Sequence, residues 1–118
     1  RAQRIQSRAA RVGFDWHEIR DVLAKVDEEL AEVRKAVEEG EAGRIREELG
    51  DLLFAVVNVS RFLKINAEEA LEKTIVKFVR RFKQVEQRIR DEGREIGDCT
   101  LAEMDAHWNA IKDDERRI

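Results

Sequence analysis

The sequence predicts an all-α fold, a bundle of four to five antiparallel helices joined by short turns. Composition is the first reason, because the 118 residues include no proline, six glycines and 42% charged side chains. A mixture of charged residues with alanine, leucine and valine favours helix over strand. Periodicity is the second reason, because apolar residues recur every three to four positions along most of the chain. A chain of this length is expected to form a single domain, residues 1–118.

The first three helices follow from this apolar spacing and from the glycines between them. Residues 1–12 predict a short basic helix, and Asp15 is a candidate N-cap for the helix that follows it. A second helix is expected over 17–39, where the apolar residues keep a 3.6-residue period. A third, over 44–63, contains the run LLFAVV and is apolar on all sides. That pattern is typical of a helix buried on every face.

Two further helices complete the bundle. A long one is expected over 67–92, and a glycine-containing loop over 93–99 follows it. Thr100 and Glu103 have the spacing of a capping box, which predicts the start of a last helix over 101–115. The long helix has an apolar stripe that is expected to face the core: Leu71, Ile75, Phe78, Val79, Phe82, Val85 and Ile89.

Charge and apolar content limit the partners of the chain. The net charge is −3, without the basic excess of a nucleic-acid-binding protein. No apolar run is long enough to span a membrane. The lone Cys99 fits a reducing cytoplasm. Because the chain begins at Arg1 rather than Met, we expect it to be a fragment of a longer chain, and whether an N-terminal domain precedes it stays open.

Acidic pairs on two successive helices carry the main functional signal. Glu29 and Glu32 lie three residues apart on the second helix, as do Glu48 and Asp51 on the third. This spacing puts both members of a pair on one helix face. If the helices pack antiparallel, four carboxylates converge, and such a cluster repels itself unless it holds a hard cation. Mg²⁺ is the natural candidate.

A simpler interpretation competes with the metal site. The acids of the second helix, Glu28 included, taken alone favour a solvated charged face. The third helix favours the metal, because unpaired carboxylates entering a core are costly. Arg46 or Lys25 are the alternatives for neutralising them. Gly50, between the two acids, indicates close approach of a helix or ligand, or packing alone.

Basic and aromatic residues of the last two helices are candidates for substrate contact. Lys77 and Arg81 lie one turn apart beside the apolar stripe of the long helix. Opposite a metal-loaded carboxylate cluster they would hold a polyphosphate. Trp108 and Lys112 share a face of the last helix. A solvated basic face, and a core position for Trp108, are the alternatives.

Several familiar chemistries are absent. The phosphate-loop pattern GxxxxGK[ST] does not occur. Cys99 has no neighbouring histidine for nucleophilic catalysis. His17 and His107 form no ExxH motif with the acids, which argues against a ferritin-like di-iron bundle.

Taken in order along the chain, these motifs resemble the MazG family of nucleoside triphosphate pyrophosphohydrolases. The family pattern EExxE followed by ExxD is matched by Glu28, Glu29, Glu32, Glu48 and Asp51. Flanking stretches also match in the family's order: RIQSRAARVGFDW, EELGDLLFAVVN, EKTIVKFVRRF and HWNAIK. The chain is most similar to the C-terminal of the two MazG domains in long bacterial members.

The resemblance implies an intertwined all-α homodimer, with a tetramer as the alternative. It also implies Mg²⁺-dependent cleavage of NTPs or dNTPs between the α and β phosphates, with Mn²⁺ as a substitute metal. Glu29, Glu32, Glu48 and Asp51 would be the metal ligands, and Glu28 or Glu32 would orient the water. Residues at the family's substrate-contact positions are Lys25, Lys77, Arg81, Trp108 and Lys112.

Two alternative interpretations of the function stay open. A narrower pyrophosphohydrolase, such as a dimeric dUTPase or a phosphoribosyl-ATP hydrolase, would share the metal motif. A catalytically idle helical dimer would bind a partner or regulator and would have no need of four converging carboxylates. The preferred base and sugar and the number of metals are not given by the sequence.

Overall fold

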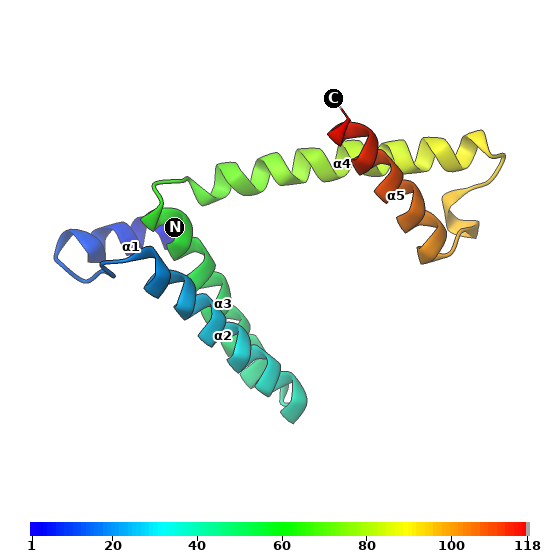
Figure 1. Cartoon of the computed structure of the whole chain (residues 1–118). Helices are drawn as coiled ribbons and strands as arrows, with labels where there is room; N and C mark the ends of the chain where they lie inside the picture. Colours follow the sequence, from blue (N-terminus) through cyan, green and yellow to red (C-terminus); the bar gives the residue numbers. More distant parts are fainter. Residues whose placement is uncertain (118) are drawn as a thin grey trace. The chain divides into compact units, whose positions relative to one another are not determined.

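The computed structural model describes residues 1–117 and is all-α, as predicted. No strand occurs within that range, and none of its helices combines the length and apolar content that crossing a bilayer requires. Ile118, the last residue of the expected single domain, lies outside the described residues. The helices, shown in Figure 1, are α1 (Ala2–Arg11), α2 (Ile19–Glu39), α3 (Ala42–Phe62), α4 (Ala67–Asp91), the short 3₁₀ helix η1 (Ile96–Asp98) and α5 (Leu101–Arg116).

The helices divide between two compact units, Arg1–Ala70 and Leu71–Ile118. The first contains α1, α2, α3 and the first residues of α4. The second contains the rest of α4 together with η1 and α5.

An antiparallel hairpin of α2 and α3 forms the body of the first unit (Figure 1). Gly40 ends α2 in the left-handed region at φ 71°, which an L side chain rarely adopts, and its N–H caps the carbonyl of Ala36. The buried apolar side chains of this unit are small: Val22, Ala36 and Ala55. Small side chains between two helices allow their backbones to approach closely, which brings the polar flanks of the seam close together as well.

Glutamine side chains attach α1 to the end of this hairpin. Gln6 is buried, and its Nε2 donates to the backbone carbonyl of Phe54 at 2.8 Å. Gln3 donates to the carbonyl of Ile65 at 2.8 Å and accepts from the N–H of Ala67 at 2.9 Å. The Gln3 contacts satisfy backbone groups between the end of α3 and the start of α4 that lack helical partners, whereas Gln6 adds a bond to a carbonyl inside α3.

The prediction that Asp15 caps the second helix is wrong. Glu18 occupies the N-cap position of α2, and its side chain makes no capping hydrogen bond. Asp15 instead accepts two hydrogen bonds from the guanidinium of Arg61, near the end of α3, at 2.6 and 3.2 Å. A short acid in this loop therefore ties the loop to α3 rather than starting α2.

The second unit has its own core, where the end of α4 packs against α5. Val85, Ile89 and Ile111 are fully buried, and Met104 and Trp108 pack against them. The predicted capping box is confirmed, with the Thr100 hydroxyl accepting from the N–H of Glu103 and the Glu103 carboxylate accepting from the N–H of Thr100. Arg94 pairs with the same carboxylate and ties the loop before α5 to the helix.

The expectation that the third helix is buried on every face is wrong within one chain. Leu49, Leu53 and Val56 of α3 keep 45%, 59% and 46% of their surface exposed. The apolar stripe of α4 is likewise buried only at Val85 and Ile89. A helix packed against one or two neighbours covers one or two of its faces, so the remaining apolar residues stay open.

The capping box gives a testable pH dependence of stability. The Arg94 guanidinium, together with the hydrogen bonds from Thr100, lowers the pKa of Glu103 from 4.5 to about 2. Because the folded-state pKa lies below the unfolded one, this carboxylate stabilises the fold fully above pH 4.5, and the contribution is lost as the pH falls toward 2. We therefore expect Glu103→Gln to lower Tm at pH 7 and the difference from wild type to shrink between pH 5 and pH 3.

The control is Glu95→Gln, which removes the same charge from an exposed position that forms no ion pair within residues 1–117. Thermal unfolding followed by circular dichroism measures both variants. A Tm difference for Glu103→Gln that stays constant from pH 7 to pH 3 would contradict the assignment.

Candidate functional site

Three acids converge where α2 and α3 lie side by side. Glu29 of α2 and Glu48 and Asp51 of α3 each place one carboxylate oxygen within 4.8 Å of the other two. Glu29 keeps only 12% of its side-chain surface exposed, and Asp51 is open to solvent. The antiparallel hairpin thus brings together three of the four acids that the sequence nominated as metal ligands.

The fourth acid, Glu32, lies one turn along α2 and faces a cation. Arg44 approaches Glu32 at 3.5 Å and binds Glu39 at 2.8 Å. Sequence reasoning considered Arg46 for this role and missed Arg44; Arg46 forms no ion pair with residues 1–117. The available signal was position, because Arg44 follows the hairpin turn and therefore lies opposite the last turns of α2.

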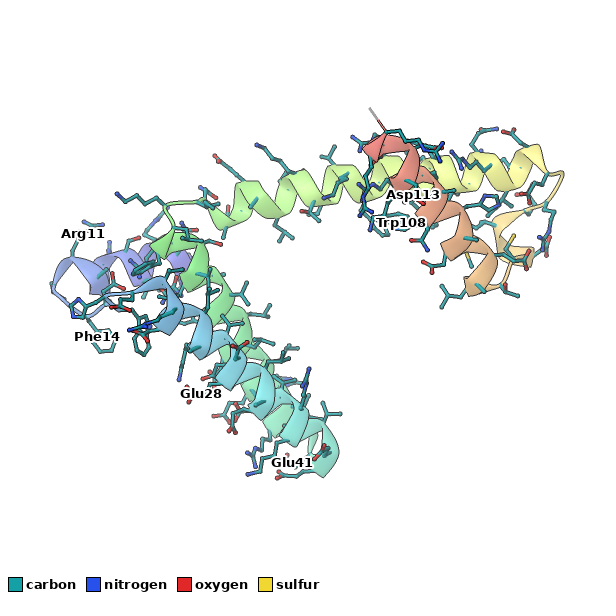
Figure 2. All side chains as sticks on the ribbon, viewed as in Figure 1. Arg11, Phe14, Glu28, Glu41, Trp108 and Asp113 are labelled. Atoms are coloured by element: carbon teal, nitrogen blue, oxygen red, sulfur yellow. The ribbon has the colours of Figure 1, made fainter. Side chains whose placement is uncertain are left out.

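Lys25 neutralises the other flank of the cluster. Its ammonium lies 3.1 Å from Glu29 and 3.5 Å from Glu28. The hydrogen bond to Glu29 is the main reason that the pKa of Lys25 is raised, so this ammonium is firmly charged at neutral pH. Glu28, labelled in Figure 2, is exposed on α2.

The cluster still lacks positive charge at its centre. Partial burial raises the pKa of Glu48, and the neighbouring carboxylates of Glu32, Asp51 and Glu29 raise it further, while Arg44 lowers it. Carboxylate oxygens in one small volume, incompletely neutralised and with one member open to solvent, are the donor set that a hard divalent cation prefers. The residues present therefore fit a metal ion.

Gly50 lies between Glu48 and Asp51 but makes no close approach. A Cβ at this position would meet no atom within 4 Å among the described residues. The surface beside the cluster is thus open rather than covered by another helix of the described chain.

Apart from Lys25, the basic and aromatic candidates belong to the second unit. Arg81 is held by Glu115 through hydrogen bonds of 2.7 and 3.0 Å, and its guanidinium lies 5.7 Å from the ring centre of Trp108. Trp108, labelled in Figure 2, also packs against Phe78 at 5.3 Å. Lys77 is exposed and Lys112 half-buried, and neither forms an ion pair within residues 1–117. Trp108 is therefore partly a core residue, and two ammonium groups keep their charge available.

A cavity of about 490 Å³ in the first unit was not anticipated from the sequence. It lies between α1, the loop after it and α3. Polar residues on its wall are Gln6, Asp15, Asn58 and Arg61. Asn58 had the one available signal, because it lies on the same face of α3 as Glu48 and Asp51. For Gln6 the sequence offered no signal of a functional role beyond its place on a short helix.

Comparison with known proteins places these features in a family. The MazG nucleotide pyrophosphohydrolase domain matches residues 17–86, a range that includes all five candidate acids together with Lys77 and Arg81. Trp108 and Lys112 lie beyond that range.

Two curated relatives are similar over almost the whole chain. The nucleoside triphosphate pyrophosphohydrolase/pyrophosphatase MazG of Thermotoga maritima is 42% identical over 111 residues, which cover 94% of this chain and 42% of the relative. The nucleoside triphosphate pyrophosphohydrolase of Escherichia coli K12 is 44% identical over 119 residues, covering 98% and 44%. The chain thus spans less than half the length of either relative. With its helical hairpin and acidic cluster, the chain belongs to the MazG nucleotide pyrophosphohydrolase domain family.

Proposed function

We propose that this chain hydrolyses nucleoside triphosphates, NTPs or dNTPs, between the α and β phosphates, releasing a nucleoside monophosphate and pyrophosphate. The observation that carries the proposal is the convergence of Glu29, Glu48 and Asp51 on the α2–α3 hairpin. Membership of the MazG family and the activity for which the two relatives are named support it. The proposal includes a housekeeping role in the cytoplasmic nucleotide pool.

The acids would hold Mg²⁺, with Mn²⁺ as a substitute. Glu29, Glu48 and Asp51 are the proposed ligands, and Glu32, which lies near enough to raise the pKa of Glu48, is the fourth. When bound, the metal supplies charge neutralisation on the phosphate oxygens and lowers the pKa of a water.

The chain's own carboxylates would orient and deprotonate the attacking water. Glu28 or Glu32 orients it and accepts its proton as the water oxygen bonds to the α phosphorus. The bond from the α phosphorus to the bridging oxygen breaks, and pyrophosphate takes the electron pair. Both carboxylates lie next to a cation, Glu28 beside Lys25 and Glu32 beside Arg44, and these ion pairs orient them at the two ends of the acidic cluster.

Cationic side chains would bind the triphosphate. Lys25, Lys77, Arg81 and Lys112 are the proposed phosphate contacts, and Trp108 is the proposed aromatic neighbour of the nucleotide. The lack of an ion pair at Lys77 and Lys112 within residues 1–117 supports this role, because an unneutralised ammonium is available to an anion. Arg81 is already oriented by Glu115.

We also propose that the chain acts as a homodimer. The support is the apolar face of α3, where Leu49, Leu53 and Val56 recur at helical spacing and remain exposed. Exposed leucine and valine in such a row mark an interaction surface more often than a solvated one.

Removing one central carboxylate should abolish turnover without unfolding the chain. We expect Glu48→Gln and Asp51→Asn each to reduce pyrophosphate release by at least about 10²-fold, because each removes a proposed metal ligand. Release is measured from a panel of NTPs and dNTPs with Mg²⁺ or EDTA, counting monophosphate as co-product, and circular dichroism checks helical content. The control is Glu47→Gln, the exposed neighbour of Glu48 outside the cluster. Wild-type activity in either variant would contradict the metal assignment.

The same cluster should respond to metal in the absence of substrate. At [Mg²⁺] about 100 times its Kd, a native-state site stabilises folding by about 2.7 kcal/mol. We expect Mg²⁺ to raise the Tm of wild type and Glu47→Gln but not of Glu48→Gln.

In EDTA the order of stability should reverse. A folded-state pKa raised above the unfolded one means that ionised Glu48 destabilises the fold, and that this cost appears as the pH rises through the raised pKa. Glu48→Gln should therefore match or exceed the wild-type Tm at pH 7 without metal. A lower Tm than Glu47→Gln in EDTA would show that the carboxylate has a stabilising partner instead.

The dimer is tested by sedimentation equilibrium. We expect Leu53→Asp to shift the wild-type dimer toward monomer, because it places a charge on the apolar face of α3. Val12→Asp, which changes an even more exposed apolar residue outside this face, is the control. A monomeric wild type would refute the dimer, and a Leu53→Asp dimer would move the interface elsewhere.

A further inference from the structure

The cavity between α1 and α3 has the properties of a ligand site. Its volume of about 490 Å³ lies within the usual range for small-molecule pockets. Its wall combines apolar side chains, Ile5 and Phe54 among them, with a few polar groups. None of the acids of the proposed metal site lines it, so it is a second feature of the first unit.

An unpaired acceptor on the cavity wall calls for a donor. Gln6 keeps only 7% of its surface exposed, and its Oε1 is buried without a hydrogen-bond partner among residues 1–117. The orientation of the amide is fixed, because Nε2 donates to the carbonyl of Phe54. A buried acceptor without a partner is costly and uncommon. A ligand whose N–H donates a hydrogen bond to this acceptor would therefore be bound favourably.

Aromatic rings flank the same cavity. Trp16 and Phe14 come from the loop after α1, and Phe54 comes from α3. Phe14, labelled in Figure 2, keeps 83% of its surface exposed, and Trp16 keeps 44%. Exposed rings at the mouth of a cavity are suited to stacking on a planar heterocycle.

Three polar side chains that hydrogen-bond to one another form one side of the cavity. The guanidinium of Arg61, whose side chain is 12% exposed, bonds both oxygens of Asp15 and also donates to Oδ1 of Asn58 at 2.9 Å. Three side chains are thereby held in fixed orientations along one side of the cavity. Preorganised polar groups distinguish ligands by their hydrogen-bonding edges.

The position of the cavity relates it to the acidic cluster. Asn58 follows Asp51 by two helical turns on one face of α3, roughly 10 Å along the helix. Trp16 also lines a smaller hollow of about 150 Å³ together with Lys25 and Glu28, the residues on the flank of the cluster. A sugar joined to its α phosphate can span this separation.

We propose that the cavity holds the nucleobase of the substrate, with Trp16 stacked on the ring and Gln6 Oε1 accepting an N–H from the base edge. The proposal rests on the proposed function and adds to it the residues that set base selectivity. Gln6 is the selectivity residue, and the Asp15–Arg61–Asn58 network limits which bases fit.

The first test isolates binding from turnover. The chain has two tryptophans, so Trp108→Phe leaves Trp16 as the only indole emitter and Trp16→Phe leaves Trp108. Nucleosides without phosphate are titrated into each protein with excitation at 295 nm. We expect saturable quenching when Trp16 is the emitter, because the proposal places this ring against the base, whether or not Trp108 also responds as a neighbour of the nucleotide. Quenching of Trp108 alone, or of neither, would overturn the proposal.

The second test separates base recognition from phosphate chemistry. Gln6→Met keeps the size of the side chain and removes the acceptor. We expect it to lower kcat/KM for nucleoside triphosphates about tenfold relative to kcat/KM for ribose 5′-triphosphate, which lacks a base. Gln3→Met is the matched control, because it removes comparable hydrogen bonds from the same helix at a residue that does not line the cavity.

The outcomes distinguish the two proposals. Saturable quenching of Trp16 without turnover of any nucleotide would support the base pocket and refute the enzymatic function. Turnover in which Gln6→Met lowers activity equally for the nucleotides and for ribose 5′-triphosphate would refute the pocket and leave the function intact. A Gln3→Met variant that alters base selectivity as strongly as Gln6→Met would assign the effect to the attachment of α1 and overturn the role of Gln6.

Discussion

The packing of α2 on α3 is the constraint on which the site depends. Small side chains at the seam, Ala36 and Ala55 among them, allow the two helices to lie close together. The same closeness forces Glu29 against Glu48 and Asp51. Carboxylates this close repel each other, so the hairpin contains an unfavourable electrostatic interaction that a divalent cation would relieve. Structural packing and the chemistry of the site are therefore two consequences of one helix–helix contact.

Positive side chains neutralise the acids at the edges of this cluster but not those at its centre. Lys25 at one end and Arg44 at the other each pair with acids of α2. The pKa of Glu48 is raised first by partial burial and then by the neighbouring carboxylates, whose repulsion Arg44 only partly offsets. A fully neutralised cluster would be a structural salt-bridge network with little affinity for metal, whereas a cluster with no cation at all would oppose folding of the hairpin. The observed arrangement lies between these extremes, which suits reversible metal binding.

Polar contacts rather than apolar burial join α1 and its loop to the hairpin. Gln6 bonds the backbone of α3, and Asp15 bonds Arg61 near its end. Such contacts fix distance and direction without filling the space between the helices, so a cavity persists where an apolar interface would collapse. This is the physical reason that a concave surface forms beside the acidic cluster, and it is why one buried polar atom, Oε1 of Gln6, has no hydrogen-bond partner there among residues 1–117.

The sequence by itself determined the helices, the capping box at Thr100 and the face on which each acid lies, because these depend on local spacing and hydrogen bonding within a few residues. It also indicated the convergence of the acids, since a short turn forces neighbouring helices to run antiparallel. Only the tertiary structure decided which cations approach the cluster, that Asp15 pairs with Arg61 rather than capping α2, and that a cavity surrounds Gln6. It also decided that α3 keeps an exposed apolar face. Long side chains reach partners far away in sequence, and burial depends on how many neighbours a helix finds, so neither can be obtained from the periodicity of a single helix.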